Sequence, residues 1–192
     1  MKVGEILENI EQKAWDRRYP IVGSEKGQVL GDLVKKFNKK NILEVGTNIG
    51  YSAITMAINL PDHGHITTIE IDENNAEEAR ENIKRAGFTD KIKVLVGPAK
   101  KILPILKKNY DMLFLDAEKE EYLDYLKLSE DKLEENSLVV ADNVKMFFEE
   151  VSPFLDYLAD TGYYENMTVD FGFDAFSVSI KKSPSRFHSL HL

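Results

Sequence analysis

Short apolar runs alternate with amphipathic stretches along most of the chain. Five apolar runs have the length of strands buried in a sheet: 42–45, 65–70, 92–96, 111–115 and 137–141. Between them apolar residues recur at helical spacing, most clearly after Glu73, where Gly87 follows as a helix-terminating glycine would. Strands that alternate with such helices predict right-handed crossovers and an α/β fold, a Rossmann-like doubly wound, mostly parallel sheet with helices on both faces.

The two ends of the chain have patterns of their own. Apolar positions from Val3 to Ala14 predict an opening helix, and a second helix is expected at about 26–37, after a break at 20–24. Strand-like runs at 163–169 and 175–181 with a short link predict an antiparallel C-terminal hairpin. Residues 183–192 are expected to form a frayed tail. No linker interrupts the pattern, so we expect one domain over 1–192.

Composition narrows the functional class. The chain has 192 residues, with 43% hydrophobic and 30% charged residues, and suits one globular domain. Its net charge of -8 argues against tight, sequence-independent binding to nucleic acid. Because it contains no cysteine, disulfides, a thiolate nucleophile and Cys-ligated zinc are excluded. The N-terminus lacks the apolar core of a signal peptide and no run could span a bilayer, so we expect a cytoplasmic protein.

Acidic residues stand where several of the apolar runs end. Glu70, Asp116 and the pair Asp142-Asn143 each follow such a run, and a glycine turn, 46–50, follows the first one. In an open parallel sheet, ligands bind beyond the carboxyl ends of the strands. The acids therefore predict one shared site, which residues 1–40 should cover.

The glycine turn favours a nucleoside as the ligand. Gly46 and Gly50 allow a tight turn and a close approach of backbone to ligand. Asn48 and Tyr51 occupy the second and third glycine positions of a dinucleotide fingerprint, so a nucleoside without pyrophosphate fits better. Glu70 stands where an acid takes the paired hydroxyls of a ribose. The alternative is a plain strand-to-helix turn with a solvated acid.

The remaining acids favour a metal. Asp116, Asp142 and Asn143 offer oxygen ligands that suit a hard cation such as Mg²⁺, which lowers the pKa of a coordinated hydroxyl. Lys119 could reach that hydroxyl and, made neutral by the nearby dication, serve as general base. Taken singly, Asp116 could cap a helix, Asp142-Asn143 could form a turn and Lys119 could be a surface lysine.

Four blocks of sequence resemble one known family. The chain is similar to the metal-dependent, S-adenosylmethionine-using O-methyltransferases of the catechol and caffeoyl-CoA type. The matching segments are the lead-in 11–15 with 22–23 and 26–28, the loop 43–47 with 50–52 and Ile69-Glu70, the block 114–119 with Tyr122, and the block 140–144.

The resemblance implies the roles of individual residues. Asp116, Asp142 and Asn143 would hold the metal, and Lys119 would be the catalytic base. The family's sheet has seven strands, the last of them antiparallel. The implied cofactor-binding residues are Val22, Glu44, Gly46, Asn48, Gly50, Ser52, Glu70, Gly97, Ala99 and Asp116. Pro98 departs from the small or acidic residue usual near the adenine, and the loop after Asn143 is shorter than in the family, so substrate identity is not transferred.

The leading hypothesis is methyl transfer from S-adenosylmethionine to a metal-bound hydroxyl of a small, catechol-like or vicinal-hydroxyl substrate. A second hypothesis is O-methylation of a hydroxylated nucleoside in tRNA, which the net charge disfavours. A third, of another class, is a cofactor-binding scaffold without catalysis. No membrane partner is expected, and the sequence leaves a homodimer open.

Overall fold

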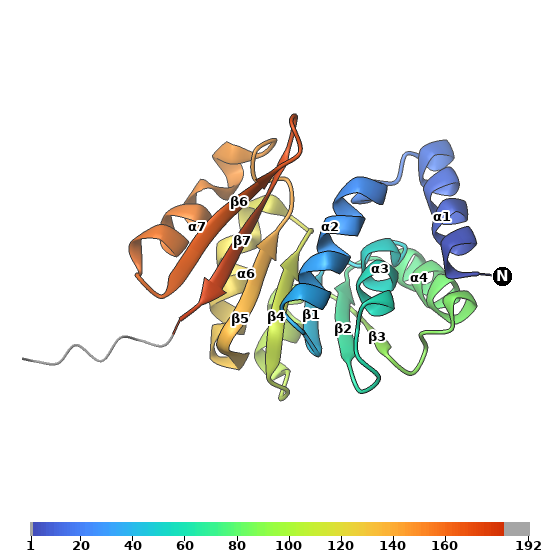
Figure 1. Cartoon of the computed structure of the whole chain (residues 1–192), viewed down its shortest axis with the longest axis horizontal. Helices are drawn as coiled ribbons and strands as arrows, with labels where there is room; N and C mark the ends of the chain where they lie inside the picture. Colours follow the sequence, from blue (N-terminus) through green and yellow to red (C-terminus); the bar gives the residue numbers. More distant parts are fainter. Residues whose placement is uncertain (1, 183–192) are drawn as a thin grey trace, which may run out of the picture.

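The sheet has seven strands in the order β3-β2-β1-β4-β5-β7-β6 (Figure 1). The computed structural model describes residues 2–182. The strands are β1 Asn41–Val45, β2 His65–Glu70, β3 Ile92–Val96, β4 Tyr110–Leu115, β5 Leu133–Ala141, β6 Tyr164–Asp170 and β7 Ala175–Lys181. Strands β1 to β5 pair in parallel, and β7 is antiparallel to both β5 and β6. The predicted doubly wound sheet and C-terminal hairpin are confirmed.

Helices cover both faces of this sheet (Figure 1). The α-helices are α1 Val3–Arg17, α2 Gly23–Lys36, α3 Tyr51–Ile58, α4 Glu73–Ala86, α5 Ala99–Ile102, α6 Tyr122–Ser129 and α7 Phe148–Asp160. Side chains of α1 to α4 share one apolar core with Ile42 of β1, and those of α5 to α7 share a second core with Leu43. Successive strand residues point to opposite faces, so two adjacent apolar residues serve two cores.

Two elements begin three or more residues earlier than predicted. Strand β5 begins at Leu133, earlier than the expected 137, because the exposed polar residues 134–136 hide its first half from an apolar pattern. Asn136 there has φ 63°, where the pairing of β4 with β5 shifts register. Helix α2 begins at Gly23, before the expected 26, since its first residues contribute little to the core and carry no apolar period.

The segments that approach the carboxyl ends of the strands come from distant parts of the chain. The α1–α2 connection and the β6–β7 turn both lie at this edge (Figure 1). Asn48 ties the glycine turn to the connection, because its Nδ2 donates to the carbonyl of Pro20 (2.5 Å). The frayed tail expected at 183–192 lies outside the described residues. In the described range, 2–182, no helix has the length and apolar character needed to cross a membrane.

Candidate functional site

Backbone hydrogen bonds hold the acids of the strand ends side by side. The N–H of Asp116 donates to the carbonyl of Val45, and the N–H of Asp142 donates to that of Leu115 (2.9 Å each). The N–H of Gly97 donates to the carbonyl of Glu70 in the same way (2.8 Å). The ladder thus continues one residue beyond each strand, and neighbouring strands lie about 4.8 Å apart. Asp116 and Asp142 are therefore neighbours at the edge of the sheet.

Each of the predicted metal ligands has one side-chain atom engaged within the protein. Lys119 donates to Asp116 Oδ1 (2.8 Å), and Lys26 donates to Asp142 Oδ1 (2.5 Å). Asn143 donates through Nδ2 to Asp174 Oδ2 (2.6 Å). Within residues 2–182, the other oxygens accept no hydrogen bond: Asp116 Oδ2, Asp142 Oδ2 and Asn143 Oδ1. Two carboxylate oxygens and one amide oxygen are thus available to a ligand.

The charges around these oxygens suit a cation. Burial raises the pKa of Asp142 to about 6, the charge of Asp116 adds to this, and Lys26 only partly opposes it. Burial also raises the pKa of Asp116, against the neighbouring Lys119. The neighbouring lysines therefore do not fully balance the negative charge of either carboxylate. Across the described residues no three His, Cys, Asp or Glu side chains converge on one point. A site with two carboxylates and an amide suits Mg²⁺ better than zinc.

Two further charged residues, which sequence reasoning missed, complete this cluster. Lys26 lies at the start of α2 and Asp174 immediately before β7, and both are buried. Lys26 Nζ lies 2.5 Å from Asp142 Oδ1 and 2.5 Å from Asp174 Oδ2. Burial alone would lower the pKa of Lys26, but the hydrogen bonds to the two acids outweigh it and raise that pKa. For Asp174 the bonds from Lys26 and Asn143 outweigh burial and lower its pKa.

A signal for Asp174 was present in the sequence. The family resemblance implies an antiparallel last strand, so β7 begins at the edge of the sheet where the parallel strands end. Ser177 is the partner of Ala141, which places residues just before β7 beside those just after β5. An acid that precedes the last strand is therefore equivalent in position to acids that follow the others.

Lys119 belongs to a short polar chain. Its Nζ lies 2.8 Å from Asp116 Oδ1 and 2.8 Å from the hydroxyl of Tyr122. Tyr122 in turn donates its O–H to the backbone carbonyl of Asp142 (3.1 Å). Burial, with the nearby acids, raises the pKa of Tyr122 well above that of a free phenol, so it stays protonated. Tyr122 thereby connects Lys119, which pairs with Asp116, to the backbone of Asp142.

A cavity of about 450 Å³ lies between the ends of β1, β2 and β4. Six of the predicted cofactor residues line it: Gly46, Asn48, Glu70, Gly97, Ala99 and Asp116. Glu70 Oε2 accepts from the N–H of Asn48 (2.7 Å) and Oε1 from that of Asp72 (3.0 Å). Since Asp116 is both a wall of the cavity and a predicted metal ligand, the two halves of the site adjoin.

The other predicted cofactor residues, Val22, Glu44, Gly50 and Ser52, are not part of this lining. Ser52 donates to Glu44 Oε1 (2.5 Å) and both are buried. Gly50 packs closely on Ala79. Val22 precedes α2 and is half-buried against the core. They lie behind or beside the glycine turn, and their contact with a cofactor stays a prediction.

Glu44 is an unusual core residue. Burial raises its pKa to about 7, although the hydrogen bonds of Ser52 and Thr68 oppose this rise. Its Oε2 is buried and has no hydrogen-bond partner within the described chain. A buried acceptor without a partner is costly, which is consistent with a group that meets a polar ligand or a proton.

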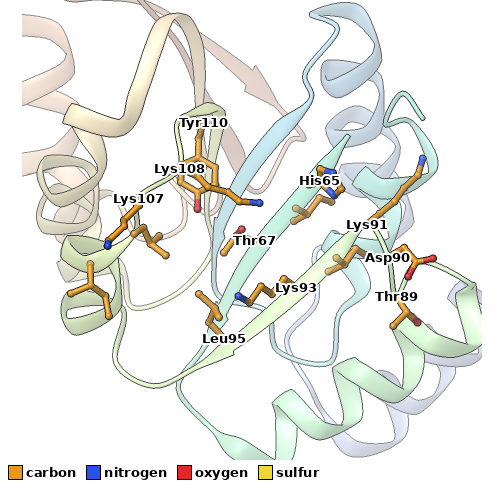
Figure 2. Close-up of a pocket in the computed structure, with 14 residues that line it drawn as sticks. His65, Thr67, Thr89, Asp90, Lys91, Lys93, Leu95, Lys107, Lys108 and Tyr110 are labelled. Carbon is orange, nitrogen blue, oxygen red and sulfur yellow. The ribbon is translucent and has the colours of Figure 1, made fainter. Parts of the chain in front are cut away.

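A second hollow lies at the opposite edge of the sheet. Figure 2 shows this hollow, of about 370 Å³, over the first halves of β2 and β3 and beside the segment before β4. Its lysines include Lys93, Lys107 and Lys108. None of the predicted site residues lines it. The candidate site is therefore the one at the carboxyl ends of the strands.

Comparison with known proteins agrees with this geometry. A family model described as O-methyltransferase matches residues 3–155. The chain therefore belongs to the O-methyltransferase family. It is 40% identical over 127 residues to a catechol O-methyltransferase of Niastella koreensis, covering 64% of this chain and 58% of that one. It is 36% identical over 129 residues to caffeoyl-CoA O-methyltransferase 2 of Petunia hybrida, and that match covers 62% of this chain and 52% of the relative.

Solved structures resemble the whole described fold. The O-methyltransferase TomG of Streptomyces achromogenes, crystallised in complex with S-adenosylmethionine, superimposes with a TM-score of 0.86 at 27% identity. That match covers 93% of this chain and 90% of TomG. The chain spans somewhat more than half the length of the two curated relatives it matches. The resemblance read from the sequence motifs is confirmed at the level of family and fold.

Proposed function

We propose that this protein is an S-adenosylmethionine-dependent O-methyltransferase that acts on a metal-bound hydroxyl of a small catechol-like or vicinal-hydroxyl substrate. One observation carries the proposal. Asp116 lines the cofactor-sized cavity and, with Asp142 and Asn143, presents an oxygen that accepts no hydrogen bond from residues 2–182. Family membership and the cofactor present in the TomG crystal support this assignment.

The cavity residues would hold the nucleoside part of the cofactor, which supplies the methyl group. Glu70 would accept hydrogen bonds from the ribose hydroxyls, because it lines the cavity at the end of β2. Gly46 and Gly97, with φ of 103° and 134°, bring backbone close to the ligand without a side chain in the way. Holding donor and acceptor in line supplies much of the rate of a transfer reaction.

Asp116, Asp142 and Asn143 would hold a divalent cation, Mg²⁺ by the chemistry of their oxygens. When bound, such an ion lowers the pKa of a coordinated hydroxyl and fixes its direction. Lys119 would take the proton from that hydroxyl as general base. Its side chain is only 13% exposed, so the proton is exchanged in a largely dry place.

The border of the acids is apolar, which supports a substrate with an aromatic ring. Met146, Phe148 and Phe173 are exposed large hydrophobic side chains in the segments that follow β5 and precede β7. Met146 and Phe173 lie next to the acidic cluster. The N–H of Met146 donates to Asp174 Oδ1 (3.1 Å), and Phe173 is the residue before Asp174. A ring that stacks on these side chains could direct a hydroxyl to the acids.

Two other functions lead to different outcomes. Methylation of a hydroxylated tRNA nucleoside would use the same acids, and a scaffold would bind cofactor without turnover. We would incubate the protein with methyl-labelled S-adenosylmethionine and Mg²⁺, adding a panel of catechols or total tRNA. Labelled catechol is expected. Labelled tRNA would favour the second function, and cofactor binding without any label transfer would favour the scaffold.

The same assay tests the metal. Excess chelator should abolish transfer, and added Mg²⁺ should restore it. Asp142→Ala should abolish transfer while S-adenosylhomocysteine, measured by calorimetry, still binds, because Asp142 does not line the cavity. Full activity in the presence of chelator would refute the metal's role.

A further inference from the structure

Lys26 connects three segments that are far apart in the sequence. Its ammonium lies between Asp142 Oδ1 and Asp174 Oδ2, at 2.5 Å from each, and it comes from α2 whereas the acids follow β5 and precede β7. The side chains of all three residues are at most 9% exposed. The nitrogen also lies 5.9 Å and 5.7 Å from the ring centroids of Phe171 and Phe176. A charge pair so dry and so close holds its members in a fixed geometry.

The bonds of this cluster decide which oxygen each metal ligand presents. Asp142 Oδ1 accepts from Lys26 and from the N–H of Asn143 (2.6 Å), which leaves Oδ2 as its open oxygen. Asn143 donates its Nδ2 to Asp174, which turns Oδ1 of the amide the other way. Asp174 itself is held by Lys26 and, through Oδ1, by the N–H of Met146. Asn143 has φ 61°, so its backbone also needs support.

We propose that Lys26 and Asp174 form a buried brace that orients Asp142 and Asn143 toward the divalent cation, so both are positioning residues for metal binding. The inference rests on the metal site of the proposed function. Removal of a residue that hydrogen-bonds a metal ligand commonly lowers metal affinity by about 10- to 100-fold. Asp174 would act mainly through Asn143, and Lys26 mainly through Asp142.

The charge of Lys26 should weaken metal binding, whereas its orientation of Asp142 should strengthen it. Variants of Lys26 can therefore distinguish the two effects. If only charge mattered, removing the Lys26 cation would tighten metal binding. The double variant Lys26→Met/Asp174→Leu removes the brace but keeps the net charge, and methionine nearly keeps the side-chain volume of lysine. Mn²⁺ affinity would be measured by titration, following the electron paramagnetic resonance signal of the unbound ion. We expect the dissociation constant of the double variant to rise by about tenfold or more.

A buried lysine elsewhere provides the matched control. Lys39 is also 7% exposed, and its Nζ donates to the backbone carbonyl of Asn136 (2.8 Å), away from the acids. Lys39→Met should leave Mn²⁺ affinity unchanged. S-adenosylhomocysteine affinity, measured on all variants, should also stay within about twofold of the wild type, since a general loss of structure would lower both. If the double variant fails to fold, Asp174→Asn and Asp174→Ala supply a second measurement. Both lose the same charge but only the asparagine keeps an acceptor for Asn143, so Asp174→Ala should weaken Mn²⁺ binding more.

The outcomes separate the two proposals. Wild-type protein that binds no Mn²⁺ would overturn the metal site of the proposed function. Wild-type binding that is lost in Asp142→Ala but unchanged in the brace variants would overturn the brace alone. Tighter Mn²⁺ binding in Lys26→Met would also overturn it, by showing that Lys26 competes with the ion for Asp142.

Discussion

A Cβ atom at Gly46 would overlap the backbone carbonyl of Asp116. The glycine turn after β1 and the first acid after β4 are therefore packed backbone against backbone. Gly46 has φ 103°, a conformation that side chains disfavour. This contact joins the cavity proposed for the cofactor to the acids proposed to hold the metal, because Asp116 belongs to both.

Gly46→Ala should therefore disturb both halves of the site. Strained backbone of this kind costs about 1–3 kcal/mol, and the overlap with Asp116 adds to it. Gly87→Ala is the matched control, since Gly87 has φ 79° but nothing within 4 Å of an added Cβ. Urea unfolding should show the larger loss of stability for Gly46→Ala. S-adenosylhomocysteine binding should be lost only there, and equal effects of the two substitutions would contradict the contact's role.

Glu70→Gln should weaken cofactor binding. Hydrogen bonds to a charged carboxylate contribute about 1.5–3 kcal/mol, so calorimetry should show roughly 10- to 100-fold lower affinity for S-adenosylhomocysteine. Glutamine can still accept from the N–H of Asn48 or Asp72, which keeps the turn in place. Glu73→Gln, in an exposed side chain at the start of α4, is the control. Unchanged affinity in Glu70→Gln would remove the ribose assignment.

The sequence predicted most of the fold because its pattern is local. Apolar runs followed by Glu70, Asp116 or Asp142 reveal both the strands and the edge at which they end. Where polar residues occupy half a strand, as in the first part of β5, the apolar pattern does not predict that part of the strand. The short link between the last two strands predicted that they pair as a hairpin, and the family resemblance implied that the last strand is antiparallel to the others. The layers of helix and strand were thus predictable from spacing.

The missed part of the site depends on contacts that are distant in sequence. Lys26 is separated from Asp142 by 116 positions and from Asp174 by 148. Lys26 lies in one of the segments that resemble the family, but that segment gives no sign that its side chain is buried, because the partners of its ammonium follow β5 and precede β7. Val22 and Ser52 show the converse case, because their family positions are present but they do not line the cavity.

Glu44 should make stability depend on pH. Its pKa, raised by burial from 4.5 to about 7, means that the folded state holds a proton that the unfolded state releases. Stability should therefore fall as pH rises between these two values, by about 3 kcal/mol at most, and stay lower above them. Glu44→Gln removes this cost and should be more stable than the wild type at pH 8.

The measurement is urea unfolding of both proteins from pH 4 to pH 8. The difference between them should grow through this range, since only in the wild type does unfolding release a proton from residue 44. Glu135→Gln, at an exposed position of β5, is the control and should follow the wild type at every pH. A constant difference across the range would show that the carboxyl of Glu44 stays ionised in the folded protein.

Substitution of Lys119 should separate a base from a charge partner. Loss of a general base typically lowers kcat by about 10²- to 10⁴-fold. Lys119→Met removes both roles, whereas Lys119→Arg keeps a cation for Asp116 but cannot give up its proton near neutral pH. If Lys119 is the base, both variants should be slow, with S-adenosylhomocysteine affinity unchanged. If it only pairs with Asp116, the arginine variant should keep most of its activity. Tyr122→Phe, which removes the hydroxyl that holds Lys119, should lower kcat less than either.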